Sequence, residues 1–163
     1  MCRGFCSFFG DFPMSANGKT AYICGPLTEL PPDVQESVRN LYSRIADAHK
    51  QYFDIRAFVP HEHYDPIRHT NFLPEDVDEA ERDQVCNKTS VLIVVAIAPS
   101  WGGGIEVEMA NHSGVPAILF YPKGKKVSRL LRGNPAIKET MEYTIEQIGI
   151  WGLMSVIQKL PVA

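Results

Sequence analysis

The sequence feature that most constrains the fold is the apolar run SVLIVVAIA at residues 90–98. The run is rich in β-branched residues and does not alternate polar with apolar positions, which is typical of a central strand in a parallel sheet covered on both faces. It is also far shorter than the roughly 20 apolar residues that a membrane-spanning helix needs. The run therefore predicts an α/β protein and no transmembrane helix.

The segments around this run alternate between short apolar stretches and amphipathic ones. Between residues 33 and 52, for example, Val38, Leu41 and Ile45 recur at spacings of three and four, as on one face of a helix. Strands are expected at 20–24, 55–59, 90–98 and 117–121, and helices at 33–52, 74–88, 105–114, 126–133 and 135–159. This order predicts a three-layer, Rossmann-like α/β fold with a mostly parallel sheet flanked by helices.

The length and composition indicate one soluble domain. The chain has 163 residues, of which 45% are hydrophobic and 21% charged, with a formal net charge of −3. Without a basic patch, neither a nucleic acid nor a membrane surface is an expected partner. We expect residues 1–18 to form a flexible leader and residues 19–163 a single domain. The four cysteines lack paired metal-ligand spacing, so we expect a reducing, cytoplasmic location, with Cys24 and Cys86 in the core.

Three loops are the candidate binding regions, because ligands of open parallel sheets lie beyond the carboxyl ends of the strands. The expected strands place these loops at residues 25–32, 60–73 and 99–104. The third, PSWGGG, leads into a helix, and glycines with amides at a helix start favour an anion such as phosphate. A tight turn without any ligand is the alternative. The spacing matches neither a P-loop nor a dinucleotide-binding fingerprint.

Individual residues near these loops allow two interpretations each. Glu106 either faces the cleft or only complements the dipole of the helix that follows. Trp101 either stacks on a nucleobase or shields its loop. The uneven spacing of His61, His63 and His69 favours surface or base-contacting roles over a metal site, and we expect no metal and no cofactor.

The motifs YICGPL at residues 22–27, PSWGGGIEVEMANHSGVPAIL at 99–119 and VSRLLRG at 127–133 together resemble the nucleoside 2-deoxyribosyltransferase superfamily. Within it, the likeness is greatest to the 2'-deoxynucleoside 5'-phosphate N-hydrolases. The resemblance covers about residues 20–135 and is weak between 30 and 75.

The resemblance implies a catalytic set. In this family a glutamate four residues after a glycine and four before an alanine is the nucleophile, and Gly102, Glu106 and Ala110 match that spacing. Tyr22 occupies the place of a tyrosine that orients the nucleophile. Asp83 is expected to assist proton transfer to the leaving base, although its spacing to the following strand is one residue short of the family pattern.

The resemblance also implies a substrate. A serine six residues before the nucleophile, here Ser100, is typical of the phosphate-specific hydrolases, whereas transferases carry an acid there. Ser128 matches a serine that reaches a neighbouring subunit's site, which implies a homodimer with shared active sites. The expected phosphate contacts are Ser100, Gly102, Gly104 and Ser128, and the other expected substrate contacts are Gly25, Pro26, Leu27, His61 and Trp101.

The expected function is hydrolysis of the base–sugar bond of nucleoside 5'-monophosphates, without a cofactor. Two alternatives stay open: a transferase acting on free nucleosides, and a non-catalytic nucleotide-binding module on the same fold. A further rival, the phosphoribohydrolases that resemble lysine decarboxylase, requires a PGGxGTxxE signature, and this sequence lacks it.

Overall fold

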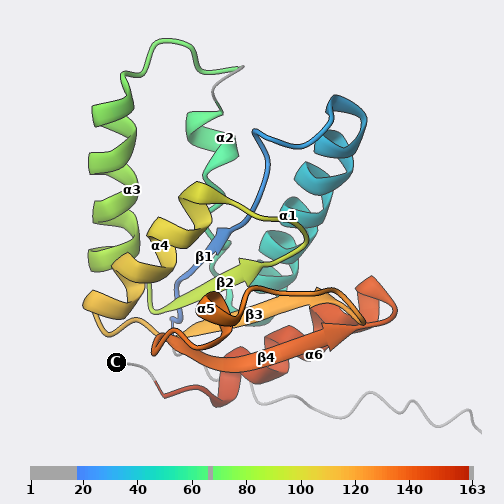
Figure 1. Ribbon diagram of the computed structural model, residues 1–163. Helices are drawn as coiled ribbons and strands as arrows, with labels where there is room; N and C mark the ends of the chain where they lie inside the picture. The colour runs from blue at the N-terminus through green and yellow to red at the C-terminus, as the bar shows by residue number, and fades with distance from the viewer. Residues whose placement is uncertain (1–17, 66–67, 162–163) are drawn as a thin grey trace, which may run out of the picture.

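Four parallel strands form one sheet in the order β1-β2-β3-β4. They are β1 (Ala21–Cys24), β2 (Val91–Val95), β3 (Ala117–Pro122) and β4 (Ile137–Tyr143). The structure is a computed structural model in which residues 18–65 and 68–161 are described (Figure 1). Strands β1 and β2 pair with Tyr22 opposite Leu92 and Cys24 opposite Val94, so these two strands end level with each other at the carboxyl edge.

Helices cover both faces of the sheet, which confirms the three-layer, Rossmann-like α/β prediction (Figure 1). Helices α1 (Pro32–Phe53) and α6 (Glu146–Lys159) pack on one face, against residues such as Ile23 and Ile93. Helix α4 (Trp101–His112) and the buried Val85 of α3 (Pro74–Lys88) pack on the other, against Tyr22 and Leu92. Because neighbouring strand residues point to opposite faces, two apolar clusters form on a single sheet. Two short helices, α2 (His61–Tyr64) and α5 (Arg129–Arg132), lie in the connections.

The strand expected at residues 55–59 is absent. Only Phe58 pairs with β1, as an isolated parallel bridge to Tyr22. Its backbone N–H donates to the Ala21 carbonyl at 2.8 Å, and its carbonyl accepts from the Ile23 N–H at 2.9 Å. Pro60 follows two residues later, and because proline has no N–H to donate, the ladder cannot continue. The chain turns into α2 instead.

The long helix expected at residues 135–159 is wrong in its first half. Residues there form β4, which pairs with β3 from Ala117 to Pro122, and α6 starts only at Glu146. The reason lies in the tertiary structure. Without β4, the edge of β3 would have unpaired backbone N–H and C=O groups, and pairing with β4 satisfies them. Side chains of Met141 and Tyr143 then pack against the cluster under α6.

Helix α4 begins at Trp101, four residues earlier than expected. Ser100 caps it, since its hydroxyl oxygen accepts from the Gly103 N–H at 3.1 Å. The three glycines are therefore the first turn of the helix and not the preceding loop. Each glycine costs a helix interior about 0.5–1 kcal/mol relative to alanine, which is why the sequence pattern alone places the start later.

The ends of the described ranges add two observations. The leader expected at residues 1–18 falls outside the described residues apart from Gly18, so that division of the chain stays a prediction. Directly after it, the buried Lys19 ammonium donates to the carbonyls of Ile157 and Leu160, both at 2.6 Å, which satisfies the C-terminal end of α6. Within residues 18–65 and 68–161, no helix has the length and apolar character needed to cross a membrane.

Candidate active site

A cavity of about 620 Å³ opens beyond the carboxyl ends of β1 and β2. This volume falls within the range typical of small-molecule sites. Its walls come from the end of β1 and the β1–α1 loop, Tyr42 of α1, the region of α2 and the segment after it, the inner face of α3, and the start of α4. The sequence-predicted residues among its lining are Gly25, Pro26, Leu27, His61, Ser100, Trp101, Gly102 and Glu106.

Glu106 is a buried carboxyl group in the wall of this cavity. It lies in the second turn of α4 and is only 7% exposed. The Tyr22 hydroxyl donates a hydrogen bond to its Oε1. Burial raises the pKa of Glu106 to about 8, and the charge of Glu81 adds to this rise, whereas the Tyr22 and Cys24 hydrogen bonds act in the opposite direction. A carboxylate with these properties can act as a nucleophile at an electron-poor carbon.

Strand β1 supplies both groups that hold Glu106. Tyr22 and Cys24 are two residues apart, so they point to the same face of the sheet, the face covered by α4. Burial and the nearby Glu106 charge raise the pKa of Tyr22 well above its usual range, which keeps its hydroxyl protonated as a donor. The Cys24 thiol also hydrogen-bonds Glu106. The sequence pattern had indicated only a core role for Cys24, because a cysteine within an apolar strand carries no polar signal.

The structure does not bring Asp83 into the cavity. Its side chain is 44% exposed and pairs with the Lys88 ammonium at 2.5 Å and the Asn87 amide at 2.9 Å, contacts that lower the Asp83 pKa. On α3, the acidic residue in the cavity lining is Glu81. Residues two apart on a helix face nearly opposite directions, so Asp83 and Glu81 cannot both face the cavity.

Glu81 has a raised pKa, which suits the proton-transfer role expected of Asp83. Burial raises its pKa to about 7, and the charge of Asp78 adds to the rise. A sequence signal for it exists, because Glu81 lies four residues after Val77 and four before Val85, on the face of α3 that the apolar pattern identifies as the inner one.

The expected phosphate contacts divide into two pairs. Ser100 and Gly102 line the cavity at the N-terminus of α4, where helix amides and the dipole favour an anion. The Ser100 hydroxyl caps the helix as an acceptor and can still donate its own hydrogen. Gly104 and Ser128 are exposed and lie outside the cavity lining, Ser128 at the start of α5.

The remaining expected contacts differ in exposure. Trp101 lines the cavity but is 88% exposed, so it stands at the mouth. His61 is buried against the Tyr42 ring, and burial lowers its pKa, which favours a neutral imidazole. Within the described ranges, no group of three or more His, Cys, Asp or Glu side chains is placed to hold a metal ion.

Gly25 is required by close packing at the floor of the β1–α1 loop. The Tyr42 hydroxyl donates to the Pro26 carbonyl at 2.7 Å, and a Cβ on residue 25 would lie 2.4 Å from that hydroxyl and 2.8 Å from the Val95 carbonyl oxygen. Gly25→Ala is therefore expected to lower the free energy of unfolding by about 1–3 kcal/mol. Gly104→Ala is the matched control, because a Cβ there meets nothing within 4 Å. Thermal denaturation of both variants checks this, and an unchanged midpoint for Gly25→Ala would contradict it.

Comparison with known proteins places the fold. No model of a protein family matches the chain, and no curated protein matches its sequence. Among solved structures, the chain is similar to the Clostridium botulinum CMP N-glycosidase BcmB, with a TM-score of 0.62 and 14% identity over 85% of this chain and 99% of that one. It is also similar to a conserved protein from Enterococcus faecalis V583, with a TM-score of 0.59 and 14% identity over 86% of this chain and 98% of that one. Each likeness covers nearly the whole of the neighbouring structure and most of this chain.

Proposed function

We propose that this chain is an N-glycosidase that hydrolyses the base–sugar bond of nucleoside 5'-monophosphates, releasing the free base and a sugar 5-phosphate. The observation that carries the proposal is the buried Glu106 carboxyl group in the cavity wall. It accepts a hydrogen bond from Tyr22 and lies in the second turn of α4, close to the Ser100 cap. The similarity to a structure named as a CMP N-glycosidase supports it. So do the motifs that resemble the nucleoside 2-deoxyribosyltransferase superfamily.

The proposed reaction has two steps. In the first, the Glu106 carboxylate attacks the anomeric carbon, the N-glycosidic bond breaks, and the departing base takes the bond's electron pair and a proton from Glu81. In the second, Glu81 accepts a proton from water, which attacks the same carbon and releases the sugar phosphate and the Glu106 carboxylate. Glu81 takes the acid role in place of Asp83, because Glu81 lines the cavity and its raised pKa retains a proton near neutral pH.

The phosphate is proposed to bind at the N-terminus of α4. That helix has 12 residues, and Ser100 and Gly102 at its start both line the cavity. The sugar would then lie between the phosphate and Glu106, one helical turn further along. Ser128 remains a proposed contact to the site of a second subunit in a homodimer, since it lies outside the cavity of its own chain.

One observation favours the alternative, a transferase acting on free nucleosides. None of the described residues that line the cavity is a lysine or arginine, while Glu29, Asp65, Glu81 and Glu106 all contribute carboxyl groups. A phosphate dianion in such a site depends on helix amides and hydroxyl groups for stabilisation. A neutral nucleoside has no phosphate charge that these carboxyl groups would repel.

Release of free base from a panel of nucleoside 5'-monophosphates and the matching nucleosides, ribo and deoxy, tests these functions. Release from monophosphates alone supports the proposal. Release from free nucleosides, or transfer of the sugar to an added base, supports the transferase. Binding without release supports a non-catalytic nucleotide-binding module.

The pH dependence of kcat/KM is expected to be bell-shaped, with its optimum between about 7 and 8. The reaction needs one proton on the pair, with Glu106 ionised and Glu81 protonated. Because the pKa values of these groups are about 8 and about 7, this is the less populated of the two singly protonated forms, and its population is greatest between the two values. The rate rises as the pair loses its first proton and falls as it loses its second. In Glu81→Gln the alkaline limb should vanish, because glutamine at residue 81 has no proton to lose. An alkaline limb that persists in this variant would contradict the assignment.

A further inference from the structure

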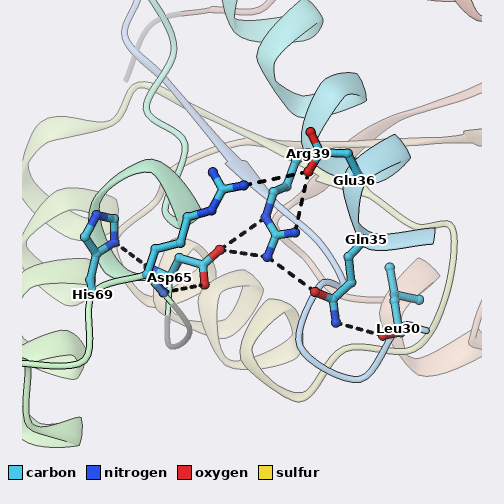
Figure 2. A network of polar contacts seen from close by, with 7 residues as sticks. Leu30, Gln35, Glu36, Arg39, Asp65 and His69 are labelled. Carbon is cyan, nitrogen blue, oxygen red and sulfur yellow. Dashed lines mark hydrogen bonds and ion pairs between the residues drawn. The ribbon is translucent and has the colours of Figure 1, made fainter. Parts of the chain in front are cut away.

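A largely buried arginine on α1 connects two loops that contribute to the cavity lining. The Arg39 side chain is only 12% exposed, and its Nε and Nη2 donate to the same Asp65 oxygen, Oδ2, at 3.1 and 2.8 Å. The Asp65 side chain is completely buried at the end of α2 and belongs to the cavity lining. Figure 2 shows this pair at the centre of a wider network of polar contacts.

On one side, the network holds the segment that follows α2. The Asp65 backbone N–H donates to Nδ1 of His69 at 3.0 Å, and the Asp65 carbonyl accepts from the His69 N–H at 2.7 Å (Figure 2). Both residues line the cavity. An imidazole whose Nδ1 accepts from a backbone amide carries its hydrogen on Nε2 when it is neutral, so this contact also selects the tautomer of His69.

On the other side, the network reaches the β1–α1 loop. Arg39 Nη2 also donates to Gln35 Oε1 at 3.3 Å, and Gln35 Nε2 donates to the Leu30 carbonyl at 2.8 Å (Figure 2). The Leu30 N–H in turn donates to the carbonyl of Leu27, a residue of the cavity wall. One guanidinium group therefore links two loops that are about 35 residues apart in the chain and that face the same cavity.

We propose that Arg39 is a positioning residue for substrate binding, which sets the separation of these two loops without touching the substrate. Arg39 lies outside the described cavity lining, whereas Asp65, His69 and Leu27 belong to it. A planar group with several donors in fixed directions suits simultaneous contacts with Asp65 and Gln35, which favours arginine over lysine at this position. The inference rests on the proposed function insofar as the substrate is a nucleotide.

The first test is the substitution Arg39→Met, with Arg39→Lys beside it. Loss of the Arg39 contacts with Asp65 and Gln35 (the Arg39 clamp) should raise KM by about 10- to 100-fold while kcat changes less than about threefold. The reason is that the two loops are misplaced, whereas Glu106 and Tyr22 keep their positions. Lysine should recover part of this loss, since it can pair with Asp65 alone. Arg44→Met is the matched control, because Arg44 is on the same helix but is half exposed and pairs with Glu146 on α6. An unchanged KM in Arg39→Met would overturn the inference.

The double variant Arg39→Met/Asp65→Asn distinguishes a role of Arg39 in substrate binding from a role in stability alone. Arg39→Met alone removes the guanidinium that pairs with the buried Asp65 carboxylate and should lower the thermal midpoint, and removal of the Asp65 charge should restore it. The clamp remains absent in the double variant, so KM should stay raised although stability returns. Recovery of KM together with stability would overturn the inference.

Binding measurements separate this inference from the proposed chemistry. The dissociation constant of CMP is measured by calorimetry in a Glu106→Gln background, with and without Arg39→Met. An increase of about tenfold or more supports the role of Arg39, even if the unmodified protein releases no base, in which case the proposed reaction alone fails. An equal dissociation constant, or no binding of CMP or any other nucleoside monophosphate, overturns the inference.

Discussion

Glu106→Gln is expected to reduce base release by on the order of 10³-fold or more while nucleotide binding persists. An amide is a poor nucleophile, but it has nearly the volume of the carboxyl group and still offers an oxygen to the Tyr22 hydroxyl, so the cavity wall should keep its shape. Single-turnover assays of base release, together with calorimetric binding of the substrate, check both parts. Turnover at an unchanged rate would show that another group attacks the sugar.

Two controls make the result specific to this carboxyl group. Glu108→Gln removes a carboxylate two residues along the same helix, where it is exposed and accepts from Asn134 at 2.8 Å, so activity should be unchanged.

The thermal stability of Glu106→Gln gives the second control. Folding raises the pKa of Glu106 from 4.5 to about 8, so the ionised group costs folding free energy as pH rises through that interval. Glu106→Gln should therefore denature at the same or a higher temperature than the unmodified protein at pH 8.

Glu81→Gln is expected to lower kcat by on the order of 10²–10⁴-fold, and Asp83→Asn to leave it unchanged. The two substitutions are chemically matched and lie two residues apart on α3. Glu81 lines the cavity, whereas Asp83 points to solvent and pairs with Lys88. Glutamine at residue 81 cannot donate the proton that the leaving base requires.

The choice of base refines this test. A nucleobase that leaves readily without protonation should be affected least by Glu81→Gln, so the rate loss should grow as the leaving base becomes more basic. Steady-state kinetics with a series of nucleotides of different base measures this dependence. Equal losses in the two variants, or a loss only in Asp83→Asn, would return the acid role to Asp83.

The fold class was predictable from the sequence because each layer has its own periodicity. The unalternating run in β2 indicates a strand buried on both faces, and the spacing of Val38, Leu41 and Ile45 indicates one buried face of α1. The wrong secondary-structure predictions occurred where pairing with a neighbouring strand decides the conformation. Residues 137–143 became a strand because the edge of β3 needed partners, and residues 55–59 did not because only Phe58 could pair before Pro60.

The candidate site was predictable in part. Through the family resemblance, the spacing of Gly102, Glu106 and Ala110 points to Glu106, and the Tyr22 hydroxyl donates to its carboxyl group; the catalytic roles of both residues stay predictions. The core position expected for Cys24 is confirmed, but its contact with Glu106, the place of Glu81 in the cavity wall and the Arg39–Asp65 pair were not predicted, since each depends on residues that are distant in the chain. No local pattern distinguishes a thiol that faces a carboxylate from one that fills a core.

The sequence by itself determined which residues are apolar, and that a carboxyl group follows a glycine-rich segment at the end of a buried strand. These properties are local, because they depend on side-chain chemistry and on spacings of two, three and four residues. The tertiary structure alone decided which carboxylate of α3 faces the cavity, how far the pKa values of Glu81 and Glu106 rise, and which arginine joins the two loops. Burial and charge proximity set these properties, and both arise only when β1, α1, α3 and α4 have packed together.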